Sequence, residues 1–295
     1  MTFLFKQLAL FFLLTIPTRV FDSYIRIISK LHVRLEYTSK DLLARTIDDK
    51  TKTLTHKTMS GRIVTMSLYT PNSVCSHRAD NFSSKEPETL RWIETFGRQG
   101  QRILFDIGAN IGVYSIYHSL LNKGKVIAFE PSFFNLKQLI KNINLNNCER
   151  LISVVANPLS NRSSFSEFLN GNTYEGGALS AFGVDYGADG KVIISSCRTQ
   201  VLGFSLDRLF ELDLLRDAPT LIKIDVDGIE DLILEGSVST LLSDACVSVL
   251  VESNNAIAEQ STKVNHILLK HGFYLDSEIS DKDSLTHNDI WVRER

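Results

Sequence analysis

The 295-residue chain is 43% hydrophobic and has a formal net charge of −2 at pH 7, which allows one large core and an extension. The charge is uneven, because residues 1–62 hold 11 basic and 5 acidic side chains and the remainder holds 21 and 29. A basic N-terminal segment suggests an anionic surface as its partner, and the acidic body argues against nucleic acid. The four cysteines contain no C-x-x-C pair, which argues against a zinc site and a disulfide framework and favours a cytoplasmic compartment.

The N-terminal sequence joins an apolar run to a basic helical pattern. Residues 8–16 are almost entirely apolar, but this run is too short to span a bilayer, which needs about 20 residues. No small-x-small cleavage site follows, so a secretory signal peptide is not favoured. Over residues 19–35, one helical face is basic and the other mostly apolar, which suits either the inner face of a membrane or packing on the protein's own domain. The basic residues are Arg19, Arg26, Lys30 and Arg34. Residues 1–35 are thus the candidate for peripheral membrane contact.

The next part of the chain leads into the main domain. Residues 41–59 are polar and predict a helix end and a loop, whereas the β-branched stretch 62–69 predicts a strand. Residues 87–96 predict a short amphipathic helix. We therefore predict an N-terminal extension over residues 1–85 and a catalytic domain over residues 86–295.

The stretch from Arg102 to Gly112 predicts a buried strand, a tight turn and the start of a helix. Asp106 lies near the end of the strand, where its carboxylate is expected to accept hydrogen bonds from a ligand. Gly108 and Gly112 are expected to let the backbone approach that ligand, because they have no Cβ atom. Eighteen residues after Gly112, a second strand ends at Glu130, where the ribose hydroxyls of a nucleotide lie in such a β-α-β unit.

The residues of this turn distinguish between two cofactors. A dinucleotide fingerprint has a glycine in the middle position, where this sequence has Asn110. The turn has no basic residue and an acid precedes it, which suits a pyrophosphate poorly. S-adenosylmethionine has no phosphate and carries an ammonium and a sulfonium, so it is the cofactor that we predict. A nicotinamide-dependent oxidoreductase is the other enzyme that the pattern allows.

Strands and helices continue to alternate along the rest of the chain. Predicted helices cover residues 133–145, 229–235 and 264–270, and another begins at residue 206. Predicted strands cover residues 151–155, 191–194, 220–225, 246–251 and 289–292. This alternation predicts a parallel α/β sheet, in which ligands bind beyond the carboxyl ends of the strands. Four acids are placed at that edge: Asp106, Glu130, Asp225 and Glu252. The glycine-rich residues 171–190 form a long loop that, with the N-terminal segment, is expected to build the acceptor pocket.

Three ordered motifs resemble those of the FkbM family of methyltransferases. They are Asp-Ile-Gly-Ala-Asn-Ile-Gly at residues 106–112, Ala-Phe-Glu-Pro at 128–131 and Leu-Ile-Lys-Ile-Asp-Val-Asp-Gly-Ile-Glu at 221–230. The similarity covers roughly residues 100–273. It implies a Rossmann-like class I methyltransferase fold, with a mostly parallel sheet and helices on both faces, to which the pattern of the N-terminal residues adds a helical extension. It also implies that Asp106, Gly108, Asn110, Gly112 and Glu130 bind S-adenosylmethionine.

The resemblance further implies O-methylation of an alcohol, on a sugar, a glycolipid or a secondary metabolite with a free hydroxyl. Its active-site motif differs from the family pattern at Asp227, where Glu is usual, and Pro158 stands where Ala is usual. An alcohol must lose its proton during methylation, and a positioned base accelerates such a step by about 10²–10⁴-fold. By strand position, Asp225 is the first candidate for this base, followed by Glu230 and Glu252.

Lys223 also belongs to the active-site motif. It shares a sheet face with Asp225, so the two can form an ion pair that is catalytic or structural. No third ligand accompanies Asp225 and Glu252, so we expect no metal. A membrane-attached module that binds the cofactor without turnover is the non-enzymatic alternative.

Overall fold

The structure is a computed structural model that describes residues 20, 22–23, 26, 42–44, 46–97, 102–187, 190–254, 258–276 and 286–293. The chain divides into two compact units, Met1–Lys50 and Thr51–Arg295. The apolar run 8–16 and most of the predicted basic helix 19–35 lie outside the described residues. Among the residues that are described, no helix combines the length and the apolar character needed to cross a membrane.

The second unit is built on a seven-stranded sheet with the order β11-β12-β10-β9-β3-β4-β5. The strands are β3 (Ile103–Ile107), β4 (Lys125–Phe129), β5 (Ile152–Val155), β9 (Leu221–Ile224), β10 (Ser248–Asn254), β11 (Phe273–Leu275) and β12 (Thr286–Arg293). Neighbours from β5 to β10 are parallel, whereas β12 runs antiparallel to both β10 and β11. The prediction of a mostly parallel sheet is confirmed, and β3, which precedes the glycine turn, lies inside it.

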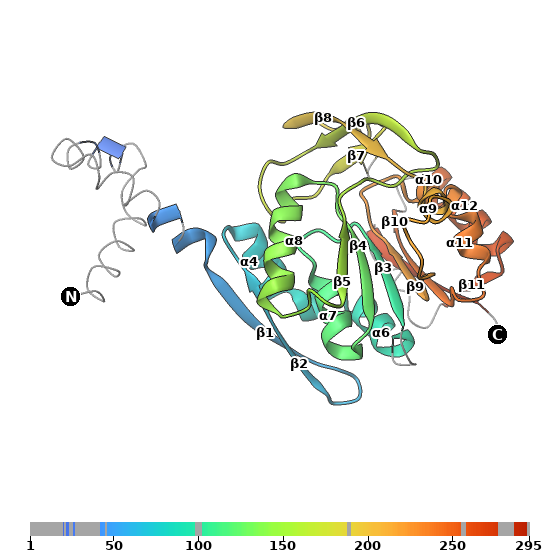
Figure 1. The fold of residues 1–295 in the computed structure, drawn as a ribbon, viewed down its shortest axis with the longest axis horizontal. Helices are drawn as coiled ribbons and strands as arrows, with labels where there is room; N and C mark the ends of the chain where they lie inside the picture. Colours follow the sequence, from blue (N-terminus) through green and yellow to red (C-terminus); the bar gives the residue numbers. More distant parts are fainter. Residues whose placement is uncertain are drawn as a thin grey trace. The chain divides into compact units, whose positions relative to one another are not determined.

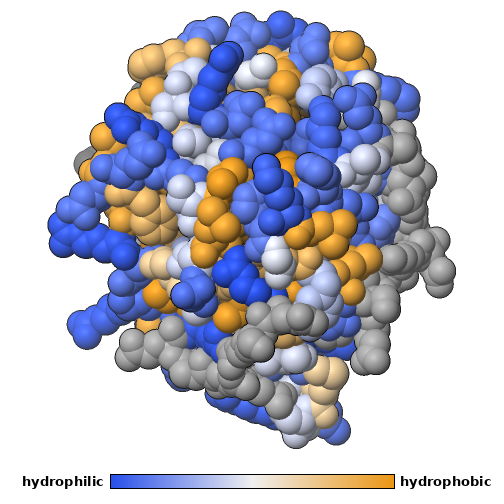
Figure 2. All heavy atoms as spheres, turned by 90° about the vertical axis from the view of Figure 1, so that its right-hand side faces the viewer, coloured by the Kyte–Doolittle hydropathy of each residue, from blue (hydrophilic) through white to orange (hydrophobic). Residues whose placement is uncertain are grey.

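Helices cover both faces of this sheet (Figure 1). They are α6 (Pro87–Phe96), α7 (Val113–Asn122), α8 (Phe133–Leu145), α9 (Leu206–Glu211), α10 (Glu230–Glu235), α11 (Val238–Leu242) and α12 (Ala258–Lys270). Successive strand residues point to opposite faces, so Leu104 packs in the core with α6–α8 while Phe105 packs in the core with α9–α12. Figure 2 shows the outer face on the side of α11 and α12, where hydrophilic residues surround small groups of hydrophobic ones.

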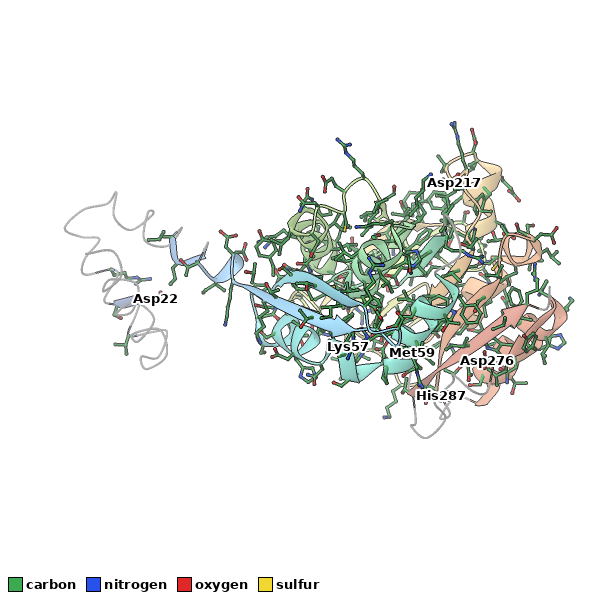
Figure 3. The ribbon with its side chains drawn as sticks, turned by 90° about the horizontal axis from the view of Figure 1, so that it is seen from below. Asp22, Lys57, Met59, Asp217, Asp276 and His287 are labelled. Atoms are coloured by element: carbon green, nitrogen blue, oxygen red, sulfur yellow. The ribbon has the colours of Figure 1, made fainter. Side chains whose placement is uncertain are left out.

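A hairpin and two short helices precede α6 in the same unit. The hairpin pairs β1 (Thr51–Lys57) with β2 (Ile63–Tyr69), and Lys57 and Met59 lie at its turn (Figure 3). The helices are α4 (Ser73–Asp80) and α5 (Phe82–Lys85). Met66 and Leu68 of β2 are buried in the core of the second unit. The compact unit therefore begins at Thr51, whereas we expected a boundary at residue 85. Of the helix end and loop that we expected over residues 41–59, residues 42–44 and 46–48 are helical, but residues 51–57 form β1.

A small antiparallel sheet is inserted between β5 and β9. It has the order β7-β6-β8, with β6 (Ser164–Asn170), β7 (Ser180–Phe182) and β8 (Cys197–Gly203). Figure 1 shows this sheet at one end of the central strands. The prediction of a strand over residues 191–194 is wrong: Val192 forms only an isolated bridge with Tyr186, and Ile194 is 93% exposed.

Candidate active site

A cleft lies between the carboxyl ends of the central strands and the inserted sheet. The space inside it is about 890 Å³, counted out into open solvent. We call it the main cleft. Its apolar wall includes Phe129, Pro158, Leu159, Phe168, Phe182 and Ile229. Its polar and charged wall includes Arg78, Asn110, Glu130, Asn135, Asp225 and Glu252. This is the edge of the sheet at which the sequence placed a ligand.

The glycine turn after β3 has a left-handed backbone at Gly108, Asn110 and Gly112, with φ values of 85°, 51° and 87°. A Cβ atom on Gly108 would lie 1.8 Å from the carbonyl oxygen of Asp225, and one on Gly112 would lie 2.4 Å from Leu139 Cδ1. The backbone contact requires glycine at residue 108, whereas at residue 112 a Leu139 methyl group would have to move and the left-handed backbone favours glycine. We had expected a ligand to require both glycines. Only Gly108 also lines the main cleft.

Glu130 follows β4 and holds the glycine turn in place. Its Oε2 accepts a hydrogen bond from the backbone N–H of Asn110 (2.7 Å), and its Oε1 accepts one from the N–H of Ser132 (2.8 Å). Burial raises the pKa of the Glu130 carboxyl to about 7, although the two N–H groups favour its ionised form. Glu130 lines the main cleft, and its binding to ribose hydroxyls stays a prediction.

The segment before β7 closes over the glycine turn. The Asn110 side chain donates to the carbonyl oxygen of Gly177 (2.8 Å), and the side chain of Asn135 donates to the same oxygen (3.1 Å). On the other side, Asp227 accepts from the N–H groups of Leu179 (2.7 Å) and Ser180 (3.3 Å). The glycine-rich segment thus contributes to the cleft wall as expected, and Asp227 anchors it.

Asp106 lies beneath the cleft and does not line it. Its carboxylate accepts a hydrogen bond from Ser115 Oγ (2.5 Å), and its backbone pairs with that of Lys223 in the sheet. Asp106 Oδ1 has no hydrogen-bond partner in the described part of the chain, and burial raises the pKa of this carboxyl. In the structure this residue faces α7 and Lys223, although the sequence placed it at the ligand.

Asp225 is held at the wall of the main cleft by a buried lysine. Lys223 is 1% exposed and its Nζ donates to Asp225 Oδ2 (2.7 Å). The charge of Lys223 outweighs burial and lowers the pKa of Asp225, and the negative charges of Asp225 and Asp106 raise the pKa of Lys223. Asp225 is therefore an ionised carboxylate, and the predicted ion pair is present.

Glu252 is the second carboxyl group at this wall. It lies within β10, and the parallel register that pairs Leu250 with Lys223 places Glu252 beside Asp225 two residues further along. Repulsion from Asp225 is the largest cause that raises the pKa of Glu252, and burial adds to it. The two carboxyl groups therefore differ, because Asp225 favours its ionised form and Glu252 favours its protonated form.

Glu230, the remaining catalytic candidate, is engaged in holding the loop after β9. Its Oε1 accepts from the N–H groups of Val226 (3.1 Å) and Gly228 (3.2 Å), and its Oε2 accepts from the side chain of Gln260 (2.7 Å). It does not line the main cleft. The structure therefore brings Asp225 and Glu252 together and leaves Glu230 behind them. Within the described ranges, no group of three or more His, Cys, Asp or Glu residues is arranged to hold a metal ion.

A smaller cavity of about 450 Å³ adjoins the main cleft at Asp225, and we call it the side cavity. Arg78 of α4 and Lys85 of α5 line both spaces. Neither residue is a candidate from the sequence alone. Both lie in a stretch of mixed polar residues without a strong apolar period, so only the fold brings them to the glycine turn.

Comparison with known proteins identifies the part of the chain that carries these features. The family described as "Methyltransferase FkbM domain" matches residues 106–275. No curated protein matches the chain.

Solved structures resemble the chain at low identity. Methyltransferase FkbM from Methylobacillus flagellatus KT is 17% identical, with 65% of this chain and 43% of that chain covered and a TM-score of 0.43. The METTL16 methyltransferase domain is 14% identical, with 81% and 86% covered and a TM-score of 0.46. The ribosomal protein L11 methylase from Lactobacillus delbrueckii subsp. bulgaricus is 13% identical, with 70% and 77% covered and a TM-score of 0.43. The present chain thus spans less than half the length of the Methylobacillus protein.

Proposed function

The chain belongs to the FkbM family of methyltransferases, and we propose that it transfers a methyl group from S-adenosylmethionine to a hydroxyl oxygen of a sugar, a glycolipid or a secondary metabolite. It is a methyltransferase with the Rossmann-like class I fold. The observation that carries the proposal is one cleft with a nucleoside-type acid, Glu130, at one end and the Asp225–Glu252 pair at the other.

The residues of the main cleft fit S-adenosylmethionine. Glu130 uses one lone pair of each oxygen on backbone N–H groups, which leaves acceptor capacity for the ribose hydroxyls. The apolar wall with Phe129, Leu159 and Phe168 suits a flat adenine ring. The absence of basic residues from residues 106–112 argues against a pyrophosphate, so a nicotinamide cofactor is not favoured.

When bound, S-adenosylmethionine supplies an electrophilic methyl group, and the protein must align an acceptor oxygen with it. In our proposal, the ionised Asp225 accepts a hydrogen bond from the acceptor hydroxyl and thereby orients its lone pair. Transfer of that methyl group to the oxygen would make the hydroxyl proton strongly acidic. It then passes to the carboxylate pair of Asp225 and Glu252, so a base of ordinary strength is sufficient.

The cellular setting is also part of the proposal. S-adenosylmethionine is an intracellular metabolite, which supports a cytoplasmic enzyme. The basic excess of residues 1–62 supports contact with an anionic membrane surface, where a glycolipid acceptor would be available. A small-molecule or glycan acceptor with a free hydroxyl, and no nucleic acid, agrees with the acidic body of the chain.

The test has a binding arm and a transfer arm. Calorimetry should show that the purified protein binds S-adenosylhomocysteine and does not bind NAD. Incubation with S-adenosylmethionine carrying a labelled methyl group and with glycan and lipid extracts should transfer label to an alkali-stable ether in an Asp225-dependent manner. Tighter binding of NAD would refute the cofactor assignment, and label in a nitrogen- or carbon-linked methyl group would refute O-methylation.

A further inference from the structure

The side cavity extends the main cleft past Asp225 toward the helices that precede the family-matched region. The two spaces share Arg78, Lys85, Gly108, Asn110 and Asp225, so a ligand in the main cleft can reach into the side cavity. The helices α4 and α5 lie before residue 106, outside the residues that match the family. Whatever they contribute to the site therefore comes from outside the matched residues.

The side cavity is lined by charges of both signs. Arg78 and Lys85 supply positive charge from α4 and α5, Lys223 supplies it from β9, and Glu86 and Asp225 supply negative charge. The charges of Arg78 and Lys85 reach the sheet, since both lower the pKa of Asp225. A cavity with this pairing complements a ligand that carries an ammonium and a carboxylate close together.

Arg78 is placed to bind the carboxylate of such a ligand. Its Nε donates to the carbonyl oxygen of Gly176 (2.8 Å), and this is the hydrogen bond that its side chain makes among the described residues. The two terminal nitrogens of the guanidinium group are left for another acceptor, and they match the two oxygens of a carboxylate. Lys85 is half exposed and donates to Glu86 (2.6 Å), so its contribution is mainly long-range charge.

We propose that Arg78, supported by the charge of Lys85, forms a carboxylate-binding site in the side cavity. The inference rests on the proposed function, because the carboxylate belongs to a ligand of the same cleft. Two sources share this chemistry: the methionine end of the cofactor, which is an α-amino acid, and an acidic group on the acceptor. The carboxylate of Glu86 on the same cavity favours the first source, since it suits the ammonium of an α-amino acid.

The alternative is that Arg78 acts only by holding Gly176 and thus the segment over the glycine turn. A pair of ligands separates the two roles. S-adenosylhomocysteine carries the amino-acid end, whereas 5′-methylthioadenosine has the same nucleoside and thioether without it. Loss of the carboxylate contact weakens the binding of S-adenosylhomocysteine alone. A loosened segment over the glycine turn weakens the binding of both ligands.

The experiment measures the affinities of both ligands by calorimetry for the full chain, for Arg78→Met and for Arg78→Lys. Arg78→Met should weaken S-adenosylhomocysteine by about 10- to 100-fold, the effect of a lost charged hydrogen bond, and leave methylthioadenosine unchanged. The affinity of Arg78→Lys for S-adenosylhomocysteine should lie between those of the original protein and Arg78→Met. Lysine keeps the positive charge but cannot donate two parallel hydrogen bonds to a carboxylate. Arg216→Met is the matched control, since Arg216 is exposed and pairs with Asp213 outside both cavities.

A second arm addresses the acceptor as the source. Saturation-transfer NMR compares glucuronate with glucose on the protein saturated with S-adenosylhomocysteine. Binding of glucuronate that Arg78→Met abolishes would assign the carboxylate to the acceptor. Equal weakening of both nucleoside ligands, or no effect of Arg78→Met in either arm, would overturn the proposal. If the unmodified protein binds neither nucleoside ligand, the proposed function itself fails and this inference falls with it.

Discussion

The Nζ atom of Lys223 lies 2.7 Å from Oδ2 of Asp225, so a buried ammonium ion holds a carboxylate at the wall of the main cleft. The two residues are two positions apart on one strand and share a face of the sheet. Lys223 also lies beside Asp106 and 5.2 Å from the centre of the Tyr114 ring. One cation therefore compensates two carboxylates in the interior and fixes the charge of the residue that we assign to the acceptor hydroxyl.

Lys223→Met should lower the free energy of unfolding by about 3–5 kcal/mol at pH 7, because it leaves two carboxylates without their buried cation. The loss should shrink toward pH 5, where protonation of Asp106 or Asp225 relieves their repulsion. Urea titrations at both pH values measure it. The control is Lys125→Met, which removes an exposed pair with Asp217 and should cost less than about 1 kcal/mol. Equal losses of unfolding free energy in the two variants would show that the buried pair stabilises the protein no more than an exposed pair does.

Asp225→Asn should leave the affinity for S-adenosylhomocysteine nearly unchanged and lower turnover on the order of 10²–10⁴-fold. The substitution keeps the shape of the side chain and removes the charge that accepts the hydroxyl proton. Calorimetry gives the affinity, and single-turnover methylation of the acceptor found by labelling gives the rate. Asp217→Asn, far from the cleft, is the control. Normal turnover of Asp225→Asn would move the assignment to Glu252.

Gly108→Ala should destabilise the protein by at least about 2 kcal/mol more than Gly61→Ala, a difference in the range of severe steric substitutions. The two glycines have nearly the same left-handed backbone, with φ values of +85° and +82°. They differ in what a Cβ atom would meet: Asp225's carbonyl oxygen at 1.8 Å for Gly108, and nothing within 4 Å for Gly61. Thermal unfolding of both variants isolates the contact. Similar losses would mean that the backbone conformation alone requires glycine at residue 108.

The sequence predicted the centre of the fold because the hydrophobic periods and the glycines that indicate it lie within one β-α-β unit. The strand before Gly108, the helix from Val113 and the strand before Glu130 all occur where periodicity placed them. The alternation of side chains along β3 also predicts the direction in which Asp106 points. Residues 104 and 106 share a face, and Leu104 is a core residue, so Asp106 had to point into the same buried layer.

Other features depend on contacts between distant parts of the chain. Strand β1 is Thr-rich and has no fully buried residue, so its hydrophobic pattern is too weak to predict it. The antiparallel place of β12 between β10 and β11 follows from pairing that local sequence does not encode. Glu230 accepts hydrogen bonds from the backbone N–H groups of Val226 and Gly228. The directions of these N–H groups cannot be predicted from the spacing of residues in the sequence. Stretch 191–194 misled because its β-branched residues suggested a strand, although Val192 and Ile194 are exposed and Ile193 is the one buried residue among the three.

Glu130→Gln should change the pH dependence of stability between about pH 4.5 and pH 7. The pKa of Glu130 is raised by burial from 4.5 to about 7, so the folded protein binds this proton more tightly than the unfolded chain. The resulting stabilisation is fully present below pH 4.5 and is lost as the pH rises through about 7. The glutamine variant does not titrate, so its stability relative to the original protein should rise over this window. Urea titrations at pH 4.5, 6 and 7.5 measure the difference, and a difference independent of pH would contradict the assignment.

Deletion of residues 1–50 should abolish binding to anionic liposomes and leave the catalytic unit folded. The structure supports cutting here, because the second compact unit begins at Thr51. In the full chain, each basic residue near the surface should contribute about 1 kcal/mol, an attraction that salt screens, whereas burial of apolar side chains from residues 8–35 should persist. Sedimentation with vesicles of phosphatidylserine and phosphatidylcholine should therefore weaken in 0.5 M NaCl without disappearing, and vesicles of phosphatidylcholine alone should bind less. If the full chain ignores both kinds of vesicle while the shortened chain loses its thermal transition, residues 1–50 are part of the folded protein and the membrane proposal is wrong.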